Sequence, residues 1–188
     1  FTIHSFPTRR SSDLDLEGAQ PEDYGKLAET LDSEFGRLDG VVHAAARLGP
    51  LTPLEHYPAE DWSGLMRGHL TGPFLLTQAC LPLLARGTGP SILFTSDARQ
   101  EAYWGAYGVS KAGLDGFIRI LAAEQEGRIR VNGINPGPLR TPLRTRAFPA
   151  EDKSHLKDPA WAVPAFLYLL GPEGRDTNGE IIRLQPDA

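Results

Sequence analysis

Short apolar runs alternate with longer amphipathic segments along most of this chain, and this alternation constrains the fold more than any other feature. The apolar runs lie at 38–46, 91–95, 129–134 and 181–184. Each has the length of a strand and little internal alternation, which is typical of strands buried on both faces of a parallel sheet. Helical spacing of apolar residues marks 21–35, 59–85, 103–126 and 159–170, with an interruption near Gly72-Pro73. Strands that alternate with helices predict a doubly wound parallel α/β sheet.

The composition indicates one globular domain and excludes several kinds of partner. The chain has 188 residues, of which 40% are hydrophobic and 23% are charged, and its formal net charge is -5. This charge does not favour nucleic acid as a partner, and no apolar run is long enough to cross a bilayer. Cys80 is the only cysteine and the five histidines lack metal-ligand spacing, so we expect neither a disulfide framework nor a metal site. A reducing, cytoplasmic setting fits this composition.

Residues 1–14 differ from the rest of the chain. They begin with Phe1 rather than Met, follow neither a helical nor a strand period, and lack the apolar stretch of a signal peptide. We interpret 1–14 as a non-native or disordered leader, and 15–188 as the C-terminal part of a single domain.

Tyr107 and Lys111 form the first candidate for chemistry. They are four residues apart in a helical segment, so both side chains lie on one face, about one turn from each other. A nearby ammonium group stabilises a phenolate and lowers the pKa of the phenol, so Tyr107 could act as a general acid or base. Ser96 ends the apolar run before them and could bring a hydroxyl to the same place. The spacing alone is weak evidence, because a half-buried aromatic residue beside a solvated lysine has the same pattern.

The sequence around this pair resembles the short-chain dehydrogenase/reductase family, and is closest to its YciK-like branch of uncharacterised bacterial oxidoreductases. The resemblance runs from Asp15 to Pro186. It is carried by Leu38-Asp-Gly-Val-Val-His43, Phe74-Leu-Leu-Thr-Gln-Ala79, Tyr103-Trp-Gly-Ala-Tyr107, Tyr107-Gly-Val-Ser-Lys111, Arg130-Val-Asn-Gly-Ile-Asn-Pro-Gly137, Thr141 and Ala147-Phe-Pro149.

The resemblance implies a Rossmann-type fold and a hydride transfer between a nicotinamide cofactor and a carbonyl or secondary alcohol. Tyr107 would be the acid/base, Lys111 would lower its pKa and bind the nicotinamide ribose, and Ser96 would orient the substrate oxygen. The cofactor would be NADP(H) or NAD(H), with NADP(H) favoured. Its expected contacts are Asp15 and Leu16 at the adenine, Ala44, Ala45 and Ala46 after the first apolar run, Tyr107 and Lys111, and Pro136, Gly137, Leu139 and Thr141 at the nicotinamide. The family also implies a homodimer or homotetramer, formed through the helices predicted at 59–85 and 103–126.

Three positions depart from the family pattern. Ala44-Ala45-Ala46 replaces the usual Asn-Ala-Gly, and His69 replaces the helix asparagine that completes the proton relay. His69 could pass a proton through a neutral imidazole, or could simply fill space. The loop between Ser96 and Tyr107 is about two residues shorter than in most members, so Asp97 could stand in place of Ser96, where its carboxylate would repel a phenolate.

The first β-α-β unit of the family, with the glycine-rich turn that receives the cofactor's pyrophosphate, is not found in this sequence. The sequence therefore predicts no measurable NADPH binding by the 188-residue chain. Two other interpretations stay open, namely a non-catalytic binding protein with the dehydrogenase shape, and an inactive fragment.

Overall fold

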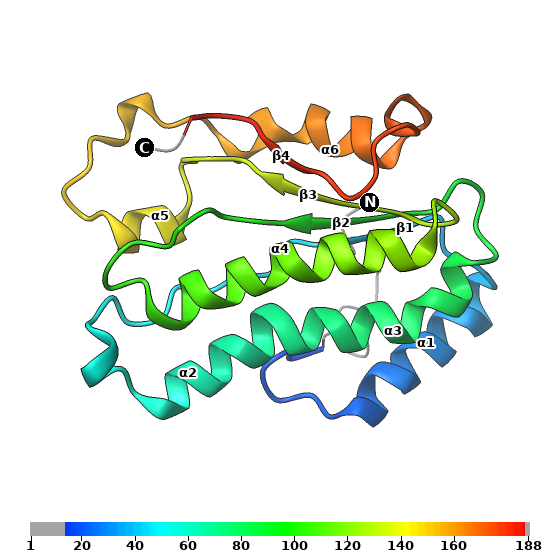
Figure 1. Cartoon of the computed structure of the whole chain (residues 1–188), viewed down its shortest axis with the longest axis horizontal. Helices are drawn as coiled ribbons and strands as arrows, with labels where there is room; N and C mark the ends of the chain where they lie inside the picture. The colour runs from blue at the N-terminus through cyan, green and yellow to red at the C-terminus, as the bar shows by residue number, and fades with distance from the viewer. Residues whose placement is uncertain (1–13, 187–188) are drawn as a thin grey trace.

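The structure is a computed structural model that describes residues 14–186. Four parallel strands form one sheet in the order β1-β2-β3-β4 (Figure 1). They are β1 (Gly40–His43), β2 (Ser91–Thr95), β3 (Arg130–Asn135) and β4 (Ile181–Arg183). Val42 of β1 pairs with Leu93 of β2, which pairs in turn with Asn132 of β3. The predicted parallel α/β sheet is therefore confirmed, although β1 ends at His43 and leaves 44–46 outside the strand.

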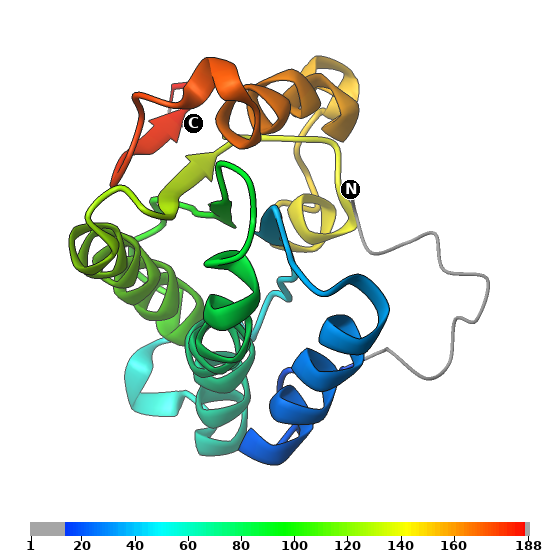
Figure 2. The same ribbon diagram turned by 90° about the vertical axis from the view of Figure 1, so that its right-hand side faces the viewer.

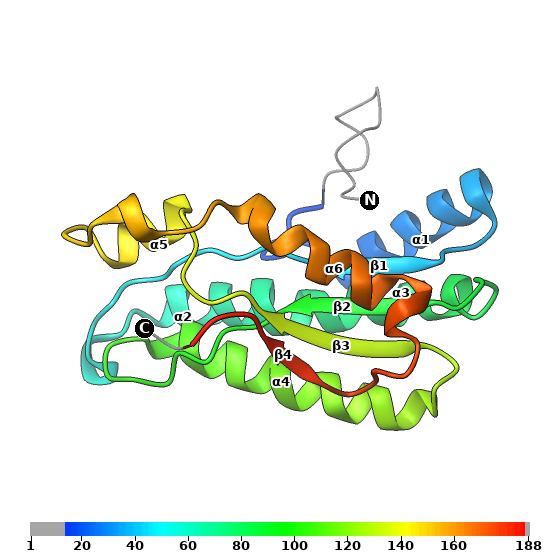
Figure 3. The same cartoon turned by 90° about the horizontal axis from the view of Figure 1, so that it is seen from above.

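Helices cover both faces of the sheet (Figure 2). On one face lie α1 (Pro21–Phe35), α2 (Ala59–Met66), α3 (Gly72–Leu84) and α4 (Gly105–Gln125), and on the other lies α6 (Val163–Leu170). Seen from the α6 side, α5 (Pro142–Ala147) sits beyond the carboxyl ends of the strands (Figure 3). Short 3₁₀ turns occur at Leu54–His56, Lys153–His155, Pro159–Ala162 and Pro172–Gly174.

The apolar runs of the sequence become strands because both faces of the sheet are covered. Ile92 and Phe94 of β2 pack toward α3 and α4, where they join Ile118 in one core cluster. Leu93, which points to the opposite face, joins Leu169 of α6 in another. All five side chains are almost completely buried. Consecutive residues of β2 are thus both apolar, as expected for a strand between two helical layers.

The helix predicted at 59–85 is divided by a π-helical turn at Arg67–Thr71. Pro73 has no backbone N–H, so the carbonyl of His69, four residues earlier, has no α-helical donor. The N–H of Gly72 donates instead to the carbonyl of Arg67, five residues earlier. The turn lies against α4, and it places His69 on that side.

The segment before α1 packs across this π turn. The side chain of Glu17 crosses Gly68 so closely that a Cβ atom on Gly68 would lie 3.0 Å from its Cγ. Glycine at position 68 therefore allows residues 14–17 to approach the site described below. Across residues 14–186, no helix is long and apolar enough to span a membrane.

Candidate active site

The candidate residues gather at the carboxyl ends of β1, β2 and β3, where ligands bind in sheets of this topology. Residues 44–46 follow β1, Ser96 and Asp97 follow β2, and Pro136 and Gly137 follow β3. The first two turns of α4 bring Tyr107 and Lys111 to the same edge. The sheet topology thus assembles segments that lie far apart in the sequence.

Tyr107 is only 4% exposed, and its hydroxyl donates a hydrogen bond to Oδ2 of Asp97 at 2.9 Å. Its ring packs beside Trp104 and Leu48, with 5.4 Å between the centroids of the two aromatic rings. Burial raises the pKa of Tyr107 above its ordinary value, and the Asp97 carboxylate raises it further. The pKa of Tyr107 therefore moves opposite to the direction expected from a neighbouring ammonium, because burial and the Asp97 carboxylate dominate the surroundings of the phenol.

Lys111 shares one face of α4 with Tyr107, as their spacing predicts. Its Nζ lies 6.0 Å from the centroid of the Tyr107 ring and donates to the carbonyl of Thr95 at 2.7 Å. Burial lowers the pKa of Lys111 to about 8, although the nearby carboxylates of Asp97 and Asp115 oppose this change. The Lys111 side chain is therefore held in the site, and it loses its proton only slightly above physiological pH.

The sequence predicts that Ser96 lies beside the phenol of Tyr107, but Asp97 takes this position. The hydroxyl of Ser96 donates to the carboxylate of Asp115 in α4. The group in contact with the Tyr107 hydroxyl is instead the half-buried carboxylate of Asp97. The short loop between Ser96 and Tyr107 had suggested this alternative, in which Asp97 stands in place of Ser96.

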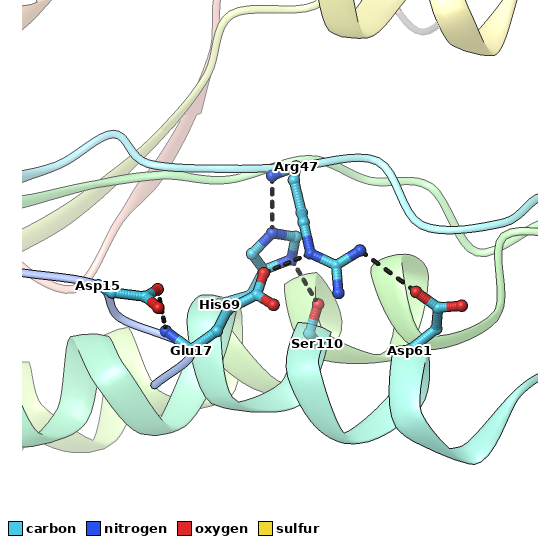
Figure 4. Close-up of polar contacts among 6 residues, drawn as sticks. All are labelled: Asp15, Glu17, Arg47, Asp61, His69 and Ser110. Atoms are coloured by element: carbon cyan, nitrogen blue, oxygen red, sulfur yellow. Dashed lines mark hydrogen bonds and ion pairs between the residues drawn. The ribbon is translucent and has the colours of Figure 1, made fainter. Parts of the chain in front are cut away.

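His69 is buried in the π turn, and both of its ring nitrogens have partners (Figure 4). Nε2 lies 3.1 Å from the backbone nitrogen of Arg47, and Nδ1 lies 3.1 Å from Oγ of Ser110. Its ring meets that of Tyr107 edge-on, with 5.6 Å between the centroids. Burial lowers the pKa of His69 to about 3, and the positive charges of Lys111 and Arg47 act in the same direction. The imidazole is therefore neutral at physiological pH.

An open pocket of about 220 Å³ lies between the segment before α1 and the loop after β1. It is lined by Leu14, Asp15, Leu16, Glu17, Ala45, Ala46, Arg47, Gly68 and His69. The guanidinium of Arg47 bridges the Glu17 carboxylate and, at 3.5 Å, the Asp61 carboxylate of α2 (Figure 4). No motif in the sequence had singled out these three charged residues. The one feature of the sequence that could have pointed to them is the position of Arg47, directly after Ala44-Ala45-Ala46.

The segment after β3 is shaped by Gly137, which has a φ of 69°. A Cβ atom there would lie 2.7 Å from Cβ of Gln185. The Gln185 amide in turn donates to the carbonyls of Pro136 and Pro138 at 2.8 and 3.0 Å. Thr141 uses its hydroxyl to cap α5, by accepting a hydrogen bond from the N–H of Arg144 at 3.1 Å. Leu139 forms an isolated β-bridge with Lys157. These contacts hold the Pro-Gly turn at the strand ends.

Comparison with known proteins places this site in a family. Residues 9–182 match the family model described as Enoyl-(Acyl carrier protein) reductase. The uncharacterised oxidoreductase YciK of Escherichia coli K12 is 41% identical over 176 residues, which cover 92% of this chain and 70% of YciK. The chain belongs to the short-chain dehydrogenase/reductase family. This assignment confirms the resemblance drawn from the sequence motifs, and relatives such as YciK are named oxidoreductases.

Solved structures of short-chain dehydrogenases share the fold. One from Pseudomonas syringae is 44% identical, with a TM-score of 0.88, and the match covers 92% of this chain and 72% of that one. Another, from Escherichia coli CFT073 and complexed with NADPH, is 40% identical, with a TM-score of 0.89 and coverage of 92% and 73%.

Proposed function

We propose that this protein is an NADP(H)-dependent oxidoreductase that interconverts a carbonyl group and a secondary alcohol, with Tyr107 as the acid/base. The observation that carries the proposal is the pairing of Tyr107 and Lys111 on one buried face of α4, at the carboxyl ends of the strands. The choice of NADP(H) is supported by the solved relative that is complexed with NADPH.

The residues present fit the two ends of such a cofactor. Asp15 and Leu16 line the open pocket at the end assigned to adenine. Its lining also includes Ala45 and Ala46, which have small side chains, and Gly68, which has none. At the nicotinamide end, Lys111 would bind the ribose, while Pro136, Gly137, Leu139 and Thr141 would lie against the ring. Ala44 is exposed in the loop after β1. When bound, the cofactor supplies or accepts the hydride.

Tyr107 moves the proton in this proposal. Its raised pKa keeps it a neutral phenol, which is the form that can donate a proton to a carbonyl oxygen as that oxygen gains negative charge. The same raised pKa opposes formation of the phenolate that alcohol oxidation requires. Proton donation to a carbonyl also leaves a phenolate, so the Asp97 carboxylate opposes proton transfer in both directions until the substrate oxygen displaces it from the phenol.

Lys111 stabilises the negative charge that develops when Tyr107 gives up its proton. It can do so only as an ammonium, so its pKa of about 8 sets an upper pH limit. The ammonium has three N–H donors, so one can keep its hydrogen bond to the Thr95 carbonyl while another binds a ribose hydroxyl.

The test is turnover of a panel of ketones and aldehydes with NADPH, in a version of the protein that also carries an upstream glycine-rich unit for the cofactor's pyrophosphate. The turnover measurements in the Discussion use this extended version. Tyr107→Phe should lower kcat by about 100-fold or more, since general acid catalysis commonly contributes that much, and the circular dichroism spectrum should not change. Tyr103→Phe is the matched control, because Tyr103 is 59% exposed and should tolerate the same change without loss.

Binding must be measured beside turnover, both in the 188-residue chain, where we expect none, and in the extended version, where we expect it. An NADPH titration followed by tryptophan fluorescence reports on the site through Trp104, which packs against Tyr107. Binding without turnover would favour a non-catalytic binding protein. Full activity of Tyr107→Phe would remove Tyr107 from the mechanism.

A further inference from the structure

We infer that His69 is a positioning residue, which ties the loop after β1 to the backbone of Tyr107, and that it does not relay protons. The inference rests on the proposed function only in taking Tyr107 as the proton donor. It is carried by a chain of three hydrogen bonds that joins Arg47, His69, Ser110 and Tyr107.

The donors in this chain fix one tautomer of the imidazole. The backbone N–H of Arg47 can only donate, so the Nε2 atom of His69 must accept and carries no hydrogen. In a neutral ring Nδ1 then carries the hydrogen, and it donates to Oγ of Ser110. The Ser110 hydroxyl is left free to donate to the carbonyl of Tyr107, at 2.8 Å. Every group in the chain is satisfied with this one assignment.

The same assignment leaves no nitrogen for a relay. A relay through imidazole takes up a proton at one nitrogen while it releases one at the other. The only bare nitrogen of His69 faces an amide N–H, which cannot deliver a proton. The charges that face the ring also oppose an imidazolium, because Lys111 from α4 and Arg47 from the loop are both positive.

Each partner of His69 belongs to an element that lines the site. Arg47 is itself held by Glu17 before α1 and by Asp61 of α2, so its backbone is well anchored. At the other end, Tyr107 is in the first turn of α4 and Ser110 is in the second. His69, in the π turn, thus connects the loop after β1, through Ser110, to the backbone of the residue that bears the phenol.

The first test reads the tautomer directly, in the unmodified protein and without cofactor. In protein labelled with ¹⁵N-histidine, long-range ¹H–¹⁵N spectra should show Nδ1 of His69 protonated and Nε2 bare, with no change between pH 8 and pH 5. The His69→Asn variant assigns the signals by their disappearance. A hydrogen on Nε2, or titration near the ordinary histidine pKa of about 6.5, would overturn the inference.

The second test asks whether His69 acts on Tyr107. Its readout is the ¹³Cζ resonance of Tyr107, which responds to the hydrogen bond from the phenol to Asp97. His69→Ala and the milder Ser110→Ala should both move it in the same direction as Asp97→Asn does, because each loosens that bond. His43→Asn is the control, since His43 is also buried but contacts Thr77 and Phe94.

An unmoved Tyr107 resonance in both the His69→Ala and Ser110→Ala variants would mean that His69 only fills space. Neither test requires NADPH or a substrate. A failure of the proposed function would therefore appear as absent binding or turnover, while a failure of this inference would appear in the spectra.

Discussion

Replacing Asp97 with asparagine should make alcohol oxidation faster, although it removes a group in contact with the proposed catalytic residue. The Asp97 carboxylate lies 2.9 Å from the Tyr107 hydroxyl, so ionising the phenol would place two negative charges side by side. At that separation the repulsion is about 1.4 kcal/mol in bulk water, and about 6 kcal/mol at an effective dielectric constant of 20. Asp97 is half-buried and partly screened, so we take the lower part of this range.

A change of about 1.4 kcal/mol corresponds to one pKa unit, so the pKa of Tyr107 should fall by about 1 to 2 units in Asp97→Asn. Each unit gives ten times more phenolate at a fixed pH below the pKa, while the weaker base offsets part of this gain. We therefore expect kcat/KM for oxidation of a secondary alcohol with NADP⁺ to rise by roughly 3-fold to 10-fold at pH 8.

The assay compares Asp97→Asn with the unmodified protein from pH 6 to pH 10. Asp176→Asn serves as the control, because its side chain is 91% exposed and its ion pair is with the adjacent Arg175. An unchanged rate in Asp97→Asn would show that the carboxylate does not govern the phenol. A loss of 100-fold or more would mean that Asp97 itself takes the proton, and would refute the assignment of this role to Tyr107.

Three further outcomes follow from the structure. Carbonyl reduction should decline as pH rises through about 8, because the Lys111 ammonium is present below that pKa and lost above it; a kcat profile that is flat from pH 7 to pH 9 would contradict this role. Phe74 and Val109 are 42% and 45% exposed on α3 and α4, so we expect a homodimer or homotetramer through these helices. Val109→Glu should shift the protein toward monomer in light scattering. An unmodified protein that is monomeric at micromolar concentration would contradict this prediction. Ile118→Ala should cost about 2–5 kcal/mol of unfolding free energy in urea, since Ile118 is fully buried between α4 and the sheet, whereas the exposed Ile120→Ala should cost much less.

The class of fold, the family and the paired tyrosine and lysine can all be predicted from the order of residues alone. Apolar runs without alternation require burial on both faces, and a spacing of four residues in a helix puts two side chains on one face. Both are local properties, so the amino-acid sequence suffices to predict the sheet of β1 to β4 and the shared face of Tyr107 and Lys111. The helix boundaries are less accurate. The interruption expected near Gly72-Pro73 lies slightly earlier, at the π turn Arg67–Thr71, and the segment 159–170 begins with a 3₁₀ turn before α6.

The groups that surround the phenol are set by the folded chain. Whether Ser96 or Asp97 faces Tyr107 depends on the path of a short loop, and no local pattern encodes that path. The direction of the pKa of Tyr107 depends in the same way on the sum of burial and charge around it, and burial cannot be read from the spacing of a tyrosine and a lysine. His69 acquires its partners, Arg47 and Ser110, from segments that are 22 and 41 residues away in the sequence. Such contacts exist only once the chain has folded, because they are set by the packing of helices against the sheet rather than by any period along the chain.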